Sequence, residues 1–305
     1  MSVKIQNISK VYGNLFALDN VSFEIGIGEV VGFIGPNGAG KSTTMKIMTG
    51  FIPPDSGEIW MNGINALEHP MAIKKLIGYL PEHNPLYQDL YVNEYLHYVA
   101  GIYRLDRKTS RKKIEEIIEL TGLWNEQKKK IGNLSKGNKQ RLGLAQALIH
   151  DPEILILDEP TSGLDPNQII EIRNLISVAG KKKTVFLSTH IMQEVEAICD
   201  RVIIINNGRI IADDKPENLA GLAPAEIKTV LVETDKPVGN HLWKDIQEIE
   251  HIREMNNCRY LLETKIDKDI RPLIFNLAVK HGFTILSMTL REKSLEELFH
   301  ELTHS

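Results

Sequence analysis

The chain has 305 residues, of which 42% are hydrophobic and 25% are charged, and its formal net charge is −4. This composition predicts a soluble globular protein with one large and one smaller domain, and the negative net charge argues against bulk electrostatic binding of nucleic acid. Two cysteines, far apart in the sequence, do not suggest a disulfide framework and fit a reducing cytoplasm. The sequence shows neither a signal peptide nor an uncharged apolar run of the ~20 residues that a membrane span needs. If the protein works at a membrane, we expect another chain to span it.

Alternation of apolar residues predicts two half-buried strands at the start of the chain, within residues 3–8 and 21–25, joined around Gly13. The short apolar run at residues 30–34 predicts a buried strand, and residues 43–49 predict a helix that Gly50 ends. A glycine-rich segment lies between this strand and this helix.

That segment matches G-x-x-x-x-G-K-[ST], the phosphate-binding P-loop. It consists of Gly35, Pro36, Asn37, Gly38, Ala39, Gly40, Lys41, Ser42 and Thr43. Glycines let backbone N–H groups approach a phosphate, and the N-terminus of the following helix adds partial positive charge. We expect Lys41 to reach the β- and γ-phosphates of a nucleotide and the Ser42 hydroxyl to bind Mg²⁺. The alternative, a glycine-rich turn matched by chance, is disfavoured by the flanking strand and helix.

The middle of the chain predicts a helical insertion, at about residues 93–126, into an α/β core. Apolar runs at residues 154–157, 185–187 and 202–205 then resume the strands of a parallel sheet. The first of these runs ends in Asp158 and Glu159, at the sheet edge where open α/β sheets bind ligands. We expect Asp158 to hold Mg²⁺ through its water shell and Glu159 to polarise the water that attacks the γ-phosphate. The alternative is a strand that ends at a charged turn.

Two further segments carry candidate site residues. Ser135 precedes a predicted helix that runs through Ala147, and with Gly137 it forms a second anion site that the P-loop does not need for itself. The alternative is a plain helix cap. His190 directly follows the strand at 185–187, and a neutral imidazole there can hydrogen-bond the γ-phosphate or the attacking water. The alternative is a structural histidine at a strand end.

Together these motifs resemble, in type and order, the ATP-binding cassette (ABC) ATPases over residues 1 to about 215. Residues 134–138, Leu-Ser-Lys-Gly-Asn, resemble the signature loop of that family, usually written LSGGQ, although Lys136 and Asn138 replace a glycine and the glutamine. Residues 162–165, which end in Asp165, resemble its D-loop. Tyr12 resembles the A-loop aromatic whose ring stacks on adenine; the alternative is an ordinary tyrosine at a strand end.

The resemblance is greatest to ATPase subunits of bacterial ABC-2-type exporters. Residues 77–87 are particularly similar to the gliding-motility-associated ATP-binding subunit, and so is the segment 294–303. One departure is Glu82, where most of the family carries a glutamine that contacts Mg²⁺ and the water. We hypothesise that Glu82 keeps this sensing role as a metal ligand beside Ser42 and Asp158.

The resemblance implies a P-loop NTPase core with an N-terminal antiparallel β subdomain and a helical insertion. It also implies a homodimer in which two chains pair head to tail around two MgATP. Residues 35–43 of one chain would then meet Ser135, Gly137 and Asp165 of the other. Glu159, His190 and Lys41 would be the catalytic residues.

The family resemblance further implies an integral membrane permease as partner, docked near residues 83–91, and a peripheral position on the inner face of the membrane. No nucleic-acid partner is expected. The main alternative is a soluble ABC ATPase that acts on ribosomes or DNA, but the chain has a single P-loop and no long coiled-coil insertion. A nucleotide-binding module without turnover and a P-loop kinase are further alternatives, disfavoured by Glu159, His190 and the segment that starts at Ser135.

We predict an ATPase domain at residues 1–218, with a helical subdomain at about 84–150, and an accessory α+β domain at 225–305. Pro216 and residues 221–224 predict a linker between them. The pattern of the accessory domain suggests the order βαββαβ, followed by a helix that starts at a capping box formed by Ser294 and Glu297. The sequence indicates no chemistry for this domain.

Overall fold

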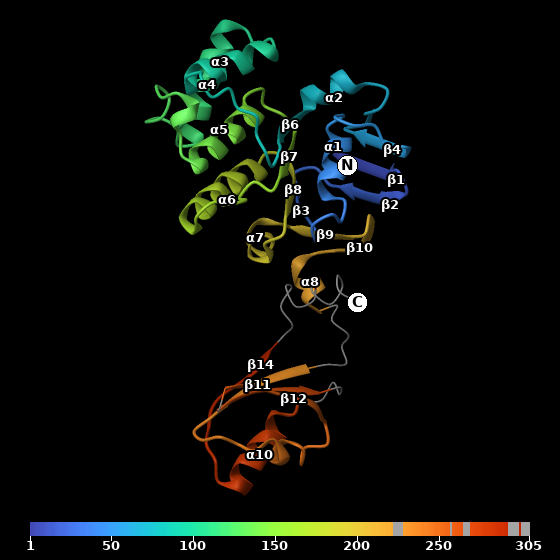
Figure 1. The fold of residues 1–305 in the computed structure, drawn as a ribbon, viewed down its shortest axis with the longest axis vertical. Helices are drawn as coiled ribbons and strands as arrows, with labels where there is room; N and C mark the ends of the chain where they lie inside the picture. The colour runs from blue at the N-terminus through green and yellow to red at the C-terminus, as the bar shows by residue number, and fades with distance from the viewer. Residues whose placement is uncertain (222–227, 257, 265–268, 292–298, 300–305) are drawn as a thin grey trace. The chain divides into compact units, whose positions relative to one another are not determined.

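The computed structural model describes residues 1–221, 228–256, 258–264, 269–291 and 299. The chain divides into two compact units, residues 1–216 and 217–305 (Figure 1), and each is described by itself. Among the described residues, no helix has the length and apolar character needed to cross a membrane. The predicted helix after Ser294 lies outside the described residues except for residue 299.

The first unit starts with a four-stranded antiparallel sheet in the order β2-β1-β4-β5. Its strands are β1 (Val3–Tyr12), β2 (Leu15–Ile25), β4 (Ser56–Met61) and β5 (Ile64–Asn65). The predicted pair of N-terminal strands is confirmed, and the turn between them contains Gly13 in a left-handed conformation with φ 59°.

The second sheet of this unit has six strands in the order β10-β9-β3-β8-β7-β6. Its strands are β3 (Val30–Ile34), β6 (Ile77–Leu80), β7 (Ile154–Asp158), β8 (Thr184–Thr189), β9 (Arg201–Asn206) and β10 (Arg209–Asp214). All neighbours pair in parallel except β9 and β10, which form a hairpin. The predicted parallel sheet is therefore confirmed.

The central strands β3, β7 and β8 are buried on both faces, so their side chains alternate between two hydrophobic cores. Phe33 and Phe186 point into the core shared with the antiparallel sheet. Their ring centroids lie 5.1 Å from each other, and 5.8 and 5.4 Å from that of Phe23. Leu157 and Leu187 point into the other core, beneath the helices. These strands therefore pack against the antiparallel sheet on one face and against the helices on the other.

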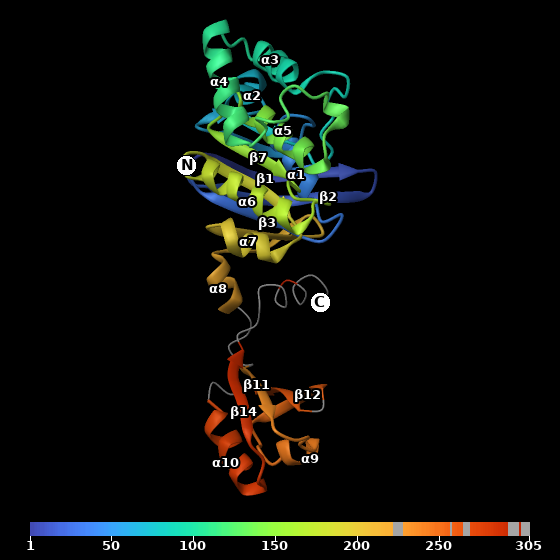
Figure 2. The same cartoon turned by 90° about the vertical axis from the view of Figure 1, so that its left-hand side faces the viewer.

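Helices cover the sheet and form the insertion. α1 (Lys41–Met48) packs in the core between the two sheets, and α2 (Pro70–Leu76) precedes β6. The insertion contains α3 (Val92–Ile102), α4 (Arg107–Leu120), the 3₁₀ turn η1 (Ile131–Asn133) and α5 (Lys136–Leu148). Figure 2 shows α6 (Pro166–Gly180) and α7 (Met192–Ile198) along the face of the sheet that includes β8.

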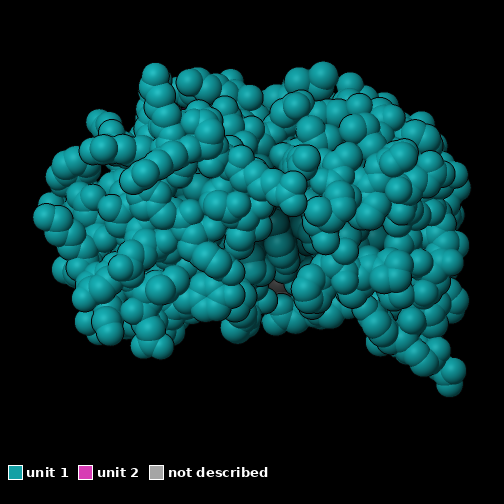
Figure 3. Space-filling view, turned by 90° about the horizontal axis from the view of Figure 1, so that it is seen from above, with its two compact units in different colours: residues 1–216 teal, residues 217–305 magenta. Residues whose placement is uncertain are grey.

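Within the insertion α3 packs against α4, Gly122 follows the end of α4 with φ 67°, and α5 packs against β6 of the sheet. Seen from the end where α2, α3 and α4 lie, the surface of residues 1–216 is hollowed near its middle (Figure 3). α1 begins at Lys41, two residues earlier than the sequence predicts. The reason is that Gly40, at φ 112°, caps the helix and leaves Lys41 and Ser42 in its first turn.

The helix α8 (Pro216–Gly221) starts at the last residue of the first unit and continues into the second. It forms where the sequence predicts a linker, because proline is well suited to the first turn of a helix. The second unit continues with β11 (Lys228–Thr234), α9 (Asn240–Trp243), β12 (Ile249–Asn256), β13 (Arg259–Thr264), α10 (Arg271–His281) and β14 (Ile285–Arg291). The strands form an antiparallel sheet in the order β12-β13-β11-β14. The suggested order βαββαβ is thus present, with its core around Trp243 and Tyr260.

Candidate functional site

The carboxyl ends of four parallel strands meet at one edge of the central sheet and bring predicted site residues together. β3, β8 and β7 lie side by side, and β6 follows β7. The P-loop comes after β3 and His190 after β8, while Asp158 ends β7 and Glu82 lies two residues beyond β6. This is the edge at which open α/β sheets bind ligands.

The P-loop passes so close to neighbouring backbone that two of its glycines have no room for a side chain. A Cβ on Gly35 would overlap the carbonyl oxygen of Ile205. A Cβ on Gly40 would lie 2.6 Å from the carbonyl oxygen of Ala17, and its φ of 112° is one that L-residues rarely adopt. The loop is therefore fixed by its contacts with β9 and β2, and its backbone shape is set before any ligand binds.

Lys41 lies at the centre of the site and is only 6% exposed. Its Nζ donates hydrogen bonds to the carbonyl oxygens of Gly35 at 2.7 Å and Pro36 at 3.2 Å, so the side chain folds back over the loop. Burial lowers the pKa of Lys41, whereas the nearby carboxylates, Glu159 foremost, raise it. A lysine in this position places a partly desolvated cation against the loop, as binding of a phosphate requires.

Asp158 is 2% exposed and is held by two serine hydroxyls. Ser188 Oγ donates to Asp158 Oδ1 at 2.7 Å, and Ser42 Oγ donates to the same oxygen at 3.3 Å. Ser188 Oγ also accepts a hydrogen bond from the backbone N–H of Glu159 at 3.0 Å, so it positions both acidic residues. Ser188 was not among the predicted site residues, because nothing but the fold places it between them.

The adjacent oxygens of Ser42 and Asp158 fit a hard cation such as Mg²⁺. Within the described part of the chain, no group of three or more His, Cys, Asp or Glu side chains forms a ready-made metal cluster. Mg²⁺ usually keeps several waters and is bound through one or two carboxylates together with substrate phosphates. The donor set is thus suited to a metal that arrives with a nucleotide.

Glu159 and His190 form a pair at the mouth of the site. His190 Nδ1 lies 2.8 Å from Glu159 Oε2, while Glu159 Oε1 lies 3.9 Å from Lys41 Nζ. Glu159 is 7% exposed and has a φ of 49°, a left-handed conformation that costs a residue with a side chain some strain. Burial raises the pKa of Glu159, and His190 and Lys41 offset part of this increase. A carboxylate whose pKa is raised is a stronger proton acceptor.

These side chains line a cavity of about 500 Å³, here named the P-loop cavity. Its lining residues are Leu15, Ala17, Asn37, Gly38, Gly40, Lys41, Ser42, Thr43, Glu82, Glu159, Ser162 and His190. Most of them were predicted, whereas Leu15, Ala17 and Ser162 were not. Tyr12 is not one of the lining residues, but it is half exposed and pairs across the strands with Leu15.

The remaining predicted site residues lie outside the P-loop cavity of their own chain. Ser135 Oγ accepts from the N–H of Asn138 at 3.2 Å and thereby caps α5. Asp165 caps α6 in the same way, accepting from the N–H of Gln168 at 3.0 Å. Gly137 is buried at the start of α5. Both side chains thus satisfy backbone N–H groups at the start of their helices, which by itself assigns no ligand to them.

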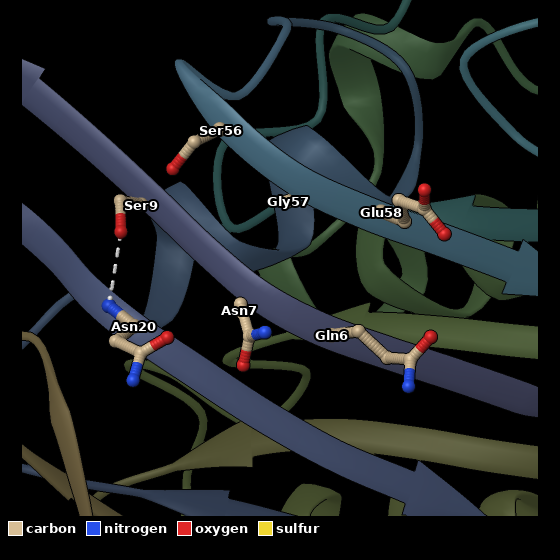
Figure 4. A pocket seen from close by; sticks show the side chains of 7 residues that line it. All are labelled: Gln6, Asn7, Ser9, Asn20, Ser56, Gly57 and Glu58. Carbon is tan, nitrogen blue, oxygen red and sulfur yellow. Dashed lines mark hydrogen bonds between the residues drawn. The ribbon is translucent and has the colours of Figure 1, made fainter.

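A second cavity, of about 560 Å³, lies on the outer face of the antiparallel sheet (Figure 4). It is lined by short polar side chains of β1, β2 and β4, and Ser9 Oγ accepts from the N–H of Asn20 at 3.0 Å. The pairing of β1 with both neighbours shifts register here, and Asn7 and Asn20 have positive φ. The hollow therefore follows from bulges in the sheet.

Comparison with known proteins identifies the family. Residues 18–162 match the family model described as "ABC transporter". The chain is 33% identical to the uncharacterized ABC transporter ATP-binding protein YxlF of Bacillus subtilis over 99% of this chain and 100% of the relative. It is 35% identical to the bacitracin transport ATP-binding protein BcrA of Bacillus licheniformis, over 98% and 96%. It is 33% identical to the Nod factor export ATP-binding protein I of Burkholderia orbicola, over 99% and 96%.

Solved structures agree with this result. An ATP-binding subunit of an ABC transporter superposes with a TM-score of 0.67 at 31% identity, over 72% of this chain and 92% of that one. The ATP-binding cassette MJ0796, in a dimeric post-hydrolysis state bound to ADP and phosphate, gives a TM-score of 0.64 at 28% identity, over 70% and 98%. The chain belongs to the ATP-binding proteins of ABC transporters and is an ATPase.

Proposed function

We propose that this ATPase binds MgATP in the P-loop cavity, dimerises around it, and drives a separate membrane permease that exports its substrate. The observation that carries the proposal is the Glu159–His190 pair, 2.8 Å apart, beside the buried ammonium of Lys41. A site that only bound nucleotide would have no use for a buried carboxylate with a raised pKa at this place.

The phosphates are held by the P-loop. Backbone N–H groups of the P-loop, which all its residues except Pro36 possess, and the N-terminus of α1 would face the β- and γ-phosphates, and Lys41 would contribute its charge. Ser42 and Asp158 would hold Mg²⁺, and Glu82, which also lines the cavity, would be a further ligand. Mg²⁺, when bound, neutralises charge on the β- and γ-phosphate oxygens.

Glu159 orients the attacking water and takes up its proton. Because an ionised carboxylate can only accept a hydrogen bond, the proton of this pair resides on His190 Nδ1. The neutral imidazole then presents Nε2 as an acceptor for the second hydrogen of the water, and the imidazolium form presents it as a donor to the γ-phosphate. The pair thus assists the nucleophile while the imidazole is neutral and the γ-phosphate when it is protonated.

The base of the nucleotide stacks on Tyr12. Tyr12 and Leu15 are paired across β1 and β2, and Leu15 lines the P-loop cavity, so the ring extends the wall on the side away from the phosphates. Stacking of a base on an aromatic ring contributes about 1–3 kcal/mol.

Two chains assemble head to tail. Support for this arrangement comes from Ser135, Gly137 and Asp165, which carry family motifs yet lie outside the P-loop cavity of their own chain. It also comes from the similarity to a cassette solved as a dimer. Each cavity is completed by the signature loop of the other chain, and the interface has two-fold symmetry with two equivalent sites.

The permease docks on the helical insertion near residues 83–91. Tyr87 there is 54% exposed and makes edge contacts with Tyr95 and with Tyr98, which is 48% exposed. Exposed tyrosines offer large contact area with a polar end, which suits a protein interface. The chain would thus be peripheral to the inner face of the membrane.

The proposed direction of transport is export. It is supported by relatives whose names refer to bacitracin transport, linearmycin resistance and Nod factor export. Residues 77–87 resemble the gliding-motility-associated ATP-binding subunit. On the basis of this resemblance we propose, as a narrower role, that the transporter takes part in gliding motility.

The variant Glu159→Gln tests the catalytic part of this proposal. We expect it to bind MgATP, to dimerise in the presence of MgATP, and to hydrolyse it at least about 100-fold more slowly, because the proton acceptor is lost while the cavity keeps its shape. Hydrolysis is measured by phosphate release and dimerisation by light scattering on a sizing column. Glu119→Gln, an exposed site on α4, serves as the matched control. An undiminished rate in Glu159→Gln would remove Glu159 from its role.

A further inference from the structure

Lys136 joins two loops that the family motifs assign to different nucleotides. It is the first residue of α5 and directly follows Ser135 in the signature loop. Its side chain extends to the D-loop of the same chain, where a Cβ on Gly163 would overlap the Lys136 ammonium. Gly163 has a φ of 66°, so both its conformation and its missing side chain allow this contact.

Local electrostatics do not explain a lysine at this position. A cation in the first turn of a helix is disfavoured by the helix dipole, and no acidic residue in that turn offsets it. Lys136 is exposed, and among the residues that the structure describes no carboxylate forms an ion pair with it. Its contact with Gly163 is the feature that gives the side chain a defined place.

The signature loop is attached to the start of α6 at two further points. A Cβ on Gly137 would lie 2.7 Å from the side-chain amide carbon of Gln168, so the loop backbone packs directly on α6. One turn further along α5, Arg141 forms an ion pair with Glu171 of α6. The signature loop, the D-loop and the beginning of α6 therefore form one packed group.

The D-loop also reaches the P-loop cavity of its own chain. Ser162 lines that cavity, and its backbone N–H donates to the carbonyl oxygen of Glu159 at 3.1 Å. A continuous series of contacts thus runs from Glu159 through Ser162 and Gly163 to Lys136. It ends at Ser135, which in the proposed dimer faces the nucleotide of the other chain.

We propose that Lys136 is a positioning residue that couples the two ATP sites of the dimer. It holds the signature loop, which serves the partner's nucleotide, against the D-loop, which lines the chain's own cavity. A change at Glu159 on hydrolysis then reaches the other site through packed contacts within one chain. This inference rests on the proposed dimer, and it goes beyond it by naming the residue through which the two sites communicate.

The dependence of the hydrolysis rate on MgATP concentration tests the proposal. For two coupled sites we expect a Hill coefficient above 1 and at most about 2 in the unmodified protein. Lys136→Ala should lower it to about 1 and leave the affinity of the monomer for a methylanthraniloyl-labelled ATP unchanged within about two-fold. Lys136→Arg keeps the reach and the charge, so it should restore the Hill coefficient.

Lys139→Ala is the matched control, because this lysine lies in the same turn and its Nζ donates to the carbonyl oxygen of Gly132, away from the D-loop. Gly163→Ala disrupts the same contact by adding a methyl group to the D-loop where the Lys136 ammonium lies. If the two changes act through one contact, the double variant should be no worse than the more severe single variant. A thermal unfolding midpoint equal to that of the unmodified protein excludes a general loss of structure in Lys136→Ala.

Two results would overturn the inference: a Hill coefficient of 1 in the unmodified protein, or one that Lys136→Ala leaves unchanged. If the proposed ATP-bound dimer does not form at all, a different result is expected. In that case Glu159→Gln stays monomeric with MgATP, whereas failure of the coupling alone leaves the Glu159→Gln dimer intact.

Discussion

At the scale of single residues, Glu159 shows how catalysis and stability oppose each other in this fold. Its side chain is 7% exposed, adopts a left-handed backbone conformation and has a raised pKa because burial disfavours its charge. Lys41 and His190 offset only part of this cost. Burial makes this carboxylate a stronger base, but it also lowers the free energy of unfolding of the protein.

Removal of this buried charge should therefore stabilise the protein in a pH-dependent manner. Because the pKa of Glu159 is higher in the folded state than its ordinary value of 4.5, the wild type loses stability as the pH rises from 4.5 through the folded-state pKa. We expect Glu159→Gln to unfold at a higher temperature than the wild type at pH 7, without nucleotide, and the difference to shrink as the pH falls toward 4.5. A difference that is absent or reversed at pH 7 would show that the carboxylate is not destabilising.

The residues that the sequence predicts for the site are those contiguous in a motif. Glycine and lysine spacing identified the P-loop, and the pair Asp158 and Glu159 stood out at the end of an apolar run. Leu15 and Ser188 were not predicted, because their positions depend on the hairpin between β1 and β2 and on the order of the strands. Ser162 belongs to the predicted D-loop segment but was not predicted to line the cavity. No local pattern marks a serine that positions two carboxylates on a neighbouring strand.

At the scale of elements, the connection that leaves β6 links the nucleotide site to the helical insertion. Glu82 lies on this connection, lines the P-loop cavity and has a side chain that is 42% exposed. It adds a negative charge to a cavity that already contains Glu159 and is to receive a polyphosphate. Mg²⁺ can offset this repulsion, so Glu82 should make nucleotide binding depend more strongly on the metal.

The variant Glu82→Gln measures this effect. We expect it to bind ATP in the presence of EDTA several-fold more tightly than the wild type, since one unit charge at short range is worth about 1 kcal/mol in a water-like medium. The Mg²⁺ concentration that half-saturates ATP hydrolysis should rise, because an amide is a weaker metal ligand than a carboxylate. Titration calorimetry gives the affinities, with Glu119→Gln as control. Equal ATP affinity and equal Mg²⁺ dependence in both proteins would exclude Glu82 from the metal site.

Elements with strong periodicity were predicted, and weakly patterned ones were not. The buried strands β3, β7 and β8 are apolar runs, and the helices of the insertion show apolar stripes. By contrast, the suggested order βαββαβ includes β12 and α9, but the sequence does not locate them: β12 is an edge strand with mostly exposed side chains, and the four residues of α9 are too few to show a period. Pro216 and residues 221–224 predict a linker where α8 forms, because proline also suits the first turn of a helix.

At the scale of the whole molecule, the two units differ in how much chemistry they carry. The first contains the P-loop cavity and the family motifs. The second is a small sheet covered by α9 and α10, whose buried side chains serve its own core. The ATP-driven cycle is therefore a property of residues 1–216, and no chemical role is proposed for the accessory unit.

The most direct test of the central claim is the identity of the partner. Glu159→Gln, held with MgATP, would be crosslinked in native membranes, solubilised in detergent and affinity-purified, with Lys41→Ala as a variant that should not form the ATP-bound dimer. The account predicts recovery of one multi-span membrane protein in near-equal amount, dependent on MgATP. Recovery of ribosomes or DNA-associated proteins, without an integral membrane partner, would contradict it.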